Sequence, residues 1–186
     1  MRTEPLGRQS GVSLIELIVF IIIVSVGVAG LVSVMNPLIR FSADPMQTKQ
    51  MAAIAESILN EALHQPFTWC DPDDATASTA LSYGDCANPQ NTTGAVPNTE
   101  SRYGSGPKTA YDNVADYGGF TKANIDDAAG GNAMTGYTAT VVVAQSGTAL
   151  GLADNTAALS VTVTVSRPGA DNFSLTGYRF RYAPRI

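Results

Sequence analysis

The chain has few of the side chains on which most catalytic and metal sites depend. Its 186 residues include one histidine, His64, and two cysteines, Cys70 and Cys86. No G-x-S-x-G, P-loop, H-E-x-x-H or paired-cysteine metal pattern occurs. His64 lies just before Pro66, at the expected end of a helix, where a histidine more often meets the helix dipole than a substrate. The sequence therefore predicts no enzyme and no cofactor.

Basic side chains are also scarce. Lys and Arg number 11 against 16 Asp and Glu, which gives a net charge of −5. An acidic chain of this kind is poorly suited to broad electrostatic binding of nucleic acid or anionic lipid. Arg179 and Arg181 share one face of the expected last strand, where alternating polar residues are typical of a solvated face. We therefore predict no nucleic-acid partner.

Charge is absent altogether from Leu17 to Met35. At about 1.5 Å per residue, a helix over this run is about 28 Å long, which is enough to cross the core of a bilayer. Glu16 directly precedes the run, and an acid in such a segment is costly and usually functional. The leader before it contains Arg2, Glu4 and Arg8 and is net positive, which predicts a cytoplasmic N-terminus and an extracytoplasmic remainder.

Residues 11–19, with the sequence GVSLIELIV, resemble the prepilin signal of type IV pilins and pseudopilins. That family has a glycine, a small or hydrophobic residue, a Ser/Thr-Leu-Ile/Val-Glu-Leu run and an apolar helix. The resemblance implies cleavage after Gly11 by a prepilin peptidase, N-methylation of Val12 and retention of the helix. It also implies other pilin subunits and an inner-membrane assembly platform as partners. The precursor is expected in the bacterial inner membrane, with its head facing the periplasm and reaching the pilus or cell surface after assembly.

Glu16 has a defined role in this interpretation. Cleavage creates an α-amino group at Val12 in an apolar setting, and an unpaired ammonium there costs on the order of several kcal/mol. Glu16 of a neighbouring subunit can neutralise that ammonium and select the axial register. Two simpler interpretations stay open: a secretory signal peptide cleaved near residues 28–30, and a single-pass anchor with an incidental acid.

A second apolar pattern follows the membrane segment. Residues 44–47 (Asp-Pro-Met-Gln) are typical of a helix start, with Asp44 as the N-cap. Apolar residues then recur at three- and four-residue steps as far as Pro66: Met51, Ile54, Ala55, Ile58, Leu59, Ala62 and Leu63. Pro37 and Pro45 predict a kink or break between the membrane half and this amphipathic half.

Residues 67 to about 135 are rich in turn-forming residues, so loops are expected there. Cys70 and Cys86 lie in this region. An even cysteine count in an oxidising compartment favours a disulfide, worth about 3 kcal/mol by loop entropy, and two free thiols are the alternative.

Asp112, Asn113 and Asp116 are weak candidates for calcium ligands, because calcium prefers several oxygen atoms on turn-rich loops. Their spacing is not that of an EF-hand, and hydrogen bonding of Asx turns to the backbone is the alternative. We therefore predict no metal site here. The acidic tract at residues 71–74 is expected to be solvated.

The C-terminal third has strand patterns. Residues 137–144 are rich in β formers, 159–165 alternate between apolar and polar, and 173–182 continue as one or two strands. An antiparallel meander on the amphipathic helix gives an α+β fold of the type IV pilin kind. The expected segments are a leader at 1–11, a transmembrane and assembly helix at 12–36, the amphipathic half at 37–66, a loop-rich region at 67–136 and an antiparallel sheet at 137–186.

Two later segments, residues 111–120 and 159–182, resemble minor pilins of mannose-sensitive haemagglutinin (MSHA) systems. The expected function is that of a minor type IV pilin-like structural subunit involved in pilus assembly and cell adhesion. Two alternatives stay open: a minor pseudopilin of a type II secretion system, and a membrane-tethered adhesin-like binding module.

Overall fold

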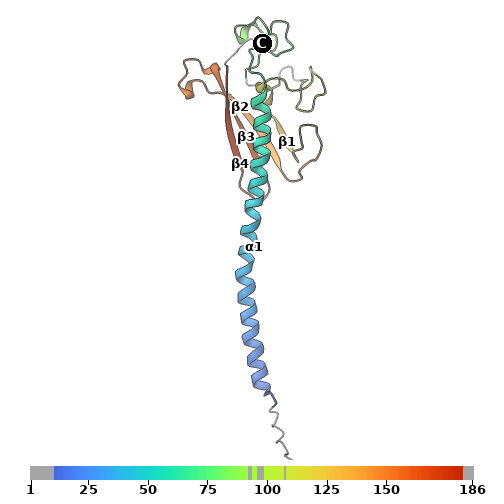
Figure 1. The fold of residues 1–186 in the computed structure, drawn as a ribbon, viewed down its shortest axis with the longest axis vertical. Helices are drawn as coiled ribbons and strands as arrows, with labels where there is room; N and C mark the ends of the chain where they lie inside the picture. Colours follow the sequence, from blue (N-terminus) through green and yellow to red (C-terminus); the bar gives the residue numbers. More distant parts are fainter. Residues whose placement is uncertain (1–10, 92–93, 96–98, 107, 182–186) are drawn as a thin grey trace, which may run out of the picture. The chain divides into compact units, whose positions relative to one another are not determined.

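The computed structural model of the chain describes residues 11–91, 94–95, 99–106 and 108–181, without the side chains of residues 36–44. Residues 1–10 of the expected leader and the end of the expected last strand lie outside these ranges. The chain divides into two compact units, Met1–Pro45 and Met46–Ile186. Helix α1 (Leu14–His64) contributes to both units (Figure 1).

Of the kink or break expected in the N-terminal helix, a break is absent. Helix α1 runs through Pro37, Asp44 and Pro45 without a new start, so the predicted N-cap at Asp44 is wrong. A proline within a helix removes one N–H hydrogen bond, and its ring crowds the carbonyl four residues earlier, at a cost of about 3 kcal/mol or more. Ending one helix and nucleating another also has a cost, because a new first turn must be fixed. The helix ends at His64, two residues before Pro66, as the proline predicts.

The second unit contains one antiparallel sheet with the strand order β1-β2-β3-β4 (Figure 1). The strands are β1 (Thr121–Ala123), β2 (Thr138–Gln145), β3 (Ala158–Ser166) and β4 (Phe173–Phe180). Short 3-10 helices lie between them or before them: η1 (Tyr83–Asp85), η2 (Val114–Tyr117), η3 (Thr148–Leu150) and η4 (Asn155–Ala157). The α+β class and the antiparallel order are confirmed. Strand β1 was not predicted, because three residues are too few to show a period.

The sheet packs one face against the part of α1 that belongs to the second unit (Figure 1). The α1 residues buried in this core are Met51, Ala55, Ile58, Leu59 and Ala62. In β3, Val161, Val163 and Val165 are fully buried, while the intervening Thr and Ser residues are partly exposed. Each such apolar side chain contributes about 1.5–3 kcal/mol through burial. Both apolar patterns found in the sequence therefore face one core.

One glycine sets how closely α1 approaches the sheet. A Cβ atom on Gly177 in β4 would lie 2.6 Å from Cδ1 of Leu63 and 3.2 Å from Cδ1 of Leu59. Real Cβ atoms essentially never show the first of these contacts, so a side chain here would require the ends of the Leu63 and Leu59 side chains to shift.

Arg181, directly after β4, does not lie on a solvated strand face as expected. Its guanidinium carbon lies 3.4 Å from the ring centroid of Trp69 and 4.2 Å from that of Phe67. The same guanidinium donates a hydrogen bond of 2.6 Å to the Tyr83 hydroxyl. Cation–π attraction stabilises a guanidinium that lies against aromatic rings, and the attraction is stronger when water is excluded. Arg181 therefore joins the end of the sheet to the loop region.

Cys70 and Cys86 form a disulfide across a sequence separation of 16, as the sequence predicted. The loop beside it is fixed further by a hydrogen bond of 2.9 Å from Asp71 N to Asn88 O. The bridge therefore closes the first loop after α1 onto itself.

Loss of this bridge is expected to destabilise the second unit. In the Cys70→Ser/Cys86→Ser variant, no cross-link restricts the unfolded chain. The unfolded state therefore gains entropy, and the free energy of unfolding falls by about 3 kcal/mol. The melting temperature should fall by about 6–12 °C. Circular dichroism of the full chain in detergent measures this, and reductant should lower the melting temperature of the wild type but not of the variant. Two reactive thiols in the native wild type would contradict the bridge.

Candidate functional site

The N-terminal segment has a simple local structure. Residues 11–13 precede the helix, and the carbonyl of Ser13 accepts a hydrogen bond of 3.1 Å from Leu17 N. Glu16 lies in the first turn of α1, where a negative charge interacts favourably with the helix dipole. The motif therefore places one carboxylate at the start of the helix.

The helix that follows is apolar on all sides and exposed along its length. Leu14–Met35 is long and apolar enough to cross a membrane. Its large apolar side chains are between 44% exposed, at Val24, and 77% exposed, at Leu14. Ser25 donates its hydroxyl to Ile21 O at 2.7 Å, so this polar group is satisfied within the helix. Such an apolar surface is far larger than a soluble monomer exposes, so lipid or protein must cover it.

Among the described residues, neither a packing contact at Gly11 nor an ion pair at Glu16 is present. A Cβ on Gly11 would meet no atom within 4 Å, and Gly11 is not among the glycines with positive φ. Neither packing nor backbone conformation therefore requires a glycine there. Within the described part of the chain, Glu16 forms no ion pair.

In the second unit, the candidate ligands Asn113 and Asp116 cap a 3-10 helix. The Asn113 side chain accepts a hydrogen bond from Ala115 N, and the Asp116 carboxylate accepts hydrogen bonds from the backbone N–H groups of Asp112 and Asn113. The Asn113 amide also donates to Thr68 Oγ1 at 2.6 Å. These are the local hydrogen bonds that Asx residues favour, so two of the three candidates have a capping role.

The third candidate, Asp112, meets acids from elsewhere in the sequence. Oxygens of Asp71, Glu100 and Asp112 all lie within 4.8 Å of one another. Asp71 is fully buried, so the expectation of a solvated tract is wrong for this residue, whereas Asp73 is exposed and Asp74 is half-buried. Its Oδ1 accepts a hydrogen bond of 2.7 Å from Asp73 N, which stabilises the turn at residues 71–73. Sequence reasoning missed Glu100, because no local period or motif surrounds it.

Burial and mutual repulsion shift the acids of this cluster. Burial, together with the neighbouring carboxylates Asp116 and Asp71, raises the pKa of Glu100 to about 8. Burial and the same kind of neighbours raise the pKa of Asp112 to about 7 and that of Asp116 to about 6. Two unit charges 4 Å apart repel by about 4 kcal/mol at an effective dielectric constant of 20. When these carboxyl groups are ionised, their mutual repulsion therefore destabilises the folded state.

This repulsion predicts an unusual pH dependence in the presence of a chelator. The folded-state pKa values of Glu100, Asp112 and Asp116 are raised, so their contribution to stability is complete below about pH 4 and is lost as the pH rises through 6 to 8. Urea denaturation of the full chain in detergent with EDTA should give a lower midpoint at pH 8.5 than at pH 5. The Glu100→Gln variant should show a smaller difference. A midpoint that is higher at pH 8.5 would contradict the predicted sign.

A second polar cluster contains the buried Arg102. Its Nε and Nη2 donate to Oε1 and Oε2 of Glu61 at 2.9 and 2.7 Å, and its Nη1 donates to Asp126 O at 3.2 Å. Tyr117 donates to Glu61 Oε1 at 2.9 Å. Burial alone would lower the pKa of Arg102, but the hydrogen bonds and charge of Glu61 hold it above its ordinary value. The cluster joins α1 to the loop region, to η2 and to the segment after β1.

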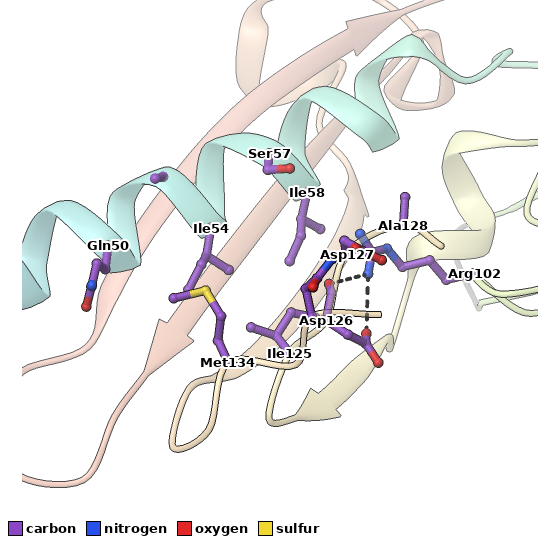
Figure 2. Close-up of a pocket in the computed structure, with 12 residues that line it drawn as sticks. Gln50, Ile54, Ser57, Ile58, Arg102, Ile125, Asp126, Asp127, Ala128 and Met134 are labelled. Atoms are coloured by element: carbon purple, nitrogen blue, oxygen red, sulfur yellow. Dashed lines mark hydrogen bonds and ion pairs between the residues drawn. The ribbon is translucent and has the colours of Figure 1, made fainter. Parts of the chain in front are cut away.

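A cavity of about 450 Å³ lies beside this cluster, between α1 and the segment after β1. In Figure 2, Ile54 of α1 and Met134 of that segment face one another, and Arg102 is turned toward Asp126. The guanidinium is already engaged by Glu61 and Asp126, so it supports the walls of the cavity and offers little free charge to a ligand.

Comparison of the chain with protein-family models, with curated proteins and with solved structures gave no match.

Proposed function

We propose that this chain is a minor type IV pilin-like structural subunit, cleaved after Gly11 and assembled into a filament through its N-terminal helix. The observation on which the proposal rests is the helix itself. Leu14–Met35 exposes its apolar side chains on every side and has one carboxylate, Glu16, at its start. A membrane covers such a helix before assembly, and neighbouring helices of the same kind cover it afterwards.

Processing supplies the partner that Glu16 lacks. Removal of the leader leaves an ammonium group on Val12, and N-methylation keeps its positive charge. In a bundle of helices the dielectric constant is low, so this ammonium and the carboxylate of a neighbouring Glu16 attract strongly. Each group destabilises an isolated subunit in lipid, and docking relieves both. The pair therefore favours one axial position of the incoming subunit.

The identity of Gly11 supports processing at this position. The fold does not require a glycine there, since no atom lies near its Cβ position and its φ is not positive. A peptidase that binds an extended strand of substrate is favoured by a residue with no side chain at the cleaved bond. The proposed partners are a prepilin peptidase, an inner-membrane assembly platform and other pilin subunits.

The second unit is the part displayed outside the membrane. Its disulfide fits an oxidising compartment, and the net positive leader fits a cytoplasmic N-terminus. The finer assignment, to an MSHA-type minor pilin similar to the D subunit, rests on residues 111–120 and 159–182.

Shearing of surface filaments from the native host tests the proposal. The mature chain should be found in the sheared fraction by immunoblot. Gly11→Leu should keep the leader and leave the chain in the inner membrane, whereas Gly30→Leu, which also has no atom within 4 Å of its Cβ position, should be processed normally. Absence of the wild-type chain from filaments, with a processed form held in the envelope, would indicate a secretion pseudopilin instead.

A further inference from the structure

Three acidic side chains from separate loop segments converge in the second unit. Asp71 follows the disulfide-bonded Cys70, Glu100 lies one residue before an isolated bridge at Ser101, and Asp112 directly precedes the cap of η2. Their carboxylate oxygens all lie within 4.8 Å of one another. The disulfide holds the first of these segments, and the capping hydrogen bonds of η2 hold the third.

Two of the three carboxylates in this cluster lack the donors that a buried acid requires, whereas Asp71 accepts hydrogen bonds from Asp73 N and Gln90 Nε2. Glu100 is 6% exposed, and neither of its oxygens accepts a hydrogen bond from a donor among the described residues. Asp112 Oδ1 is likewise buried without a donor. Within the described ranges, no lysine or arginine forms an ion pair with any of the three. The charged groups that act most strongly on Glu100 and Asp112 are Asp71, Asp73, Asp112 and Asp116, all negative.

A half-buried acid of the same unit shows that the fold can provide donors. Glu61 receives Arg102 Nε, Arg102 Nη2 and the Tyr117 hydroxyl. Buried carboxylates normally have such partners, so unpaired oxygens call for an explanation such as an ion. Here Glu100 and Asp112 both have buried oxygens without a donor, and carboxylate oxygens of the two residues lie within 4.8 Å of one another.

We propose that Asp71, Glu100 and Asp112 bind a divalent cation, and that this cation is calcium. The candidate ligands are all carboxylate oxygens, the type that calcium and magnesium prefer, whereas copper and most zinc sites use cysteine sulfur or histidine nitrogen. Calcium accepts six to eight oxygens in an adaptable arrangement, with carbonyl groups and waters completing the set. Magnesium demands near-ideal octahedral geometry, which three loop carboxylates do not impose.

Binding would link three loop segments that share little regular structure. The cation would neutralise the mutual repulsion of the cluster and hold the segments around residues 71, 100 and 112 together. Its effect on the second unit would resemble that of a further cross-link beside the disulfide. The proposal is independent of filament assembly, because it concerns groups within the second unit alone.

Calorimetric titration and thermal melting of the full chain in detergent, after removal of metals with EDTA, test the site. Calcium chloride should bind at one site with a dissociation constant of about 1 mM or tighter. The melting temperature should rise progressively with calcium concentration, because the ion binds only the folded state. Magnesium chloride should produce a smaller rise at the same concentration.

Two variants distinguish calcium binding at this cluster from a general electrostatic effect of calcium on an acidic protein. Glu100→Gln should weaken calcium binding at least tenfold and remove the calcium-dependent rise. Asp171→Asn, which removes one exposed charge outside the cluster, should respond to calcium as the wild type does. Without calcium, Glu100→Gln should melt at or above the temperature of the wild type, since an amide replaces an unpaired buried acid; this result also shows that the variant folds.

Terbium provides a direct readout of position. Trp69, the one tryptophan of the chain, is two residues from Asp71 and can sensitise terbium luminescence over a short distance. The wild type should give a signal that calcium displaces, and Glu100→Gln should lose it. No calcium binding by the wild type, or equal binding by Glu100→Gln, would overturn the site. An equal response to magnesium would overturn the choice of calcium.

Discussion

Glu16→Val should enter filaments at least tenfold less efficiently than the wild type, while being processed and inserted normally. The substitution removes the carboxylate and leaves the Val12 ammonium of a neighbouring subunit unpaired in an apolar bundle. Coupling energies of close charge pairs at interfaces are about 1.5–7 kcal/mol, and about 1.4 kcal/mol already corresponds to a factor of ten. Co-expression with the wild type, followed by shearing and quantitative mass spectrometry, measures the ratio of the two forms in the filament.

Glu56→Val is the matched control for this experiment. Glu56 is an exposed acid on the same helix, outside the apolar segment, so the same chemical change is made without touching the proposed pair. The control should incorporate as the wild type does. Glu16→Asp should give an intermediate ratio, because it keeps the charge but shortens its reach. Equal incorporation of Glu16→Val and the wild type would remove the charge-pairing role.

Arg102→Met should be the most destabilising single substitution among those considered in the second unit. The Arg102 side chain is 2% exposed and forms a two-pronged ion pair with Glu61, which is itself 22% exposed. Breaking a fully buried pair costs about 3–5 kcal/mol; here the remaining Glu61 is partly exposed and keeps the hydrogen bond from Tyr117, so we expect a loss of about 3 kcal/mol. The melting temperature of the full chain should therefore fall by about 6–12 °C.

Lys122→Met is the control for the effect of charge loss itself. Lys122 pairs with Asp126 at 3.2 Å, but its side chain is 38% exposed. Exposed pairs contribute about 0–1 kcal/mol, so its melting temperature should fall by no more than about 4 °C. The double variant Glu61→Leu/Arg102→Met should recover part of the loss, since no lone charge remains. A loss in Arg102→Met no larger than in Lys122→Met would contradict the buried pair.

The parts of the fold with a local period were predictable from the sequence. The alternation at residues 159–165 matches β3 (Ala158–Ser166), because an antiparallel strand with one buried face must alternate. The apolar stripe from Met51 to Ala62 is the face of α1 that packs on the sheet. Strand β1 was missed, since its three residues depend on pairing with β2 and have no pattern of their own.

At Asp44 and Pro45 the sequence predicted a feature that the structure lacks, the start of a new helix. The Asp-Pro-Met-Gln pattern is a genuine start signal, yet α1 continues through it. Local capping preferences amount to about 1 kcal/mol, which a helix already established on both sides can outweigh. Sequence patterns report such preferences without showing whether the neighbouring turns override them.

The acidic cluster lay beyond sequence reasoning for a different reason. Asp112 was recognised as a candidate because it is surrounded by other oxygen-bearing side chains, but its neighbours in space are Asp71 and Glu100. These residues are far apart in the sequence and are brought together by turns, the disulfide and an isolated bridge. No periodicity links them. The roles proposed for the N-terminal residues, in contrast, depend on a short run of consecutive positions, which a sequence displays directly.

The intact mass of the mature chain, isolated from its native host, tests the central claim most directly. If the apolar helix is an assembly element, the mass should correspond to a chain that begins at Val12 with one added methyl group, and fragmentation should place Glu16 in the mature protein. A chain that begins downstream of Met35 would have lost both the helix and its acid, and would contradict the account.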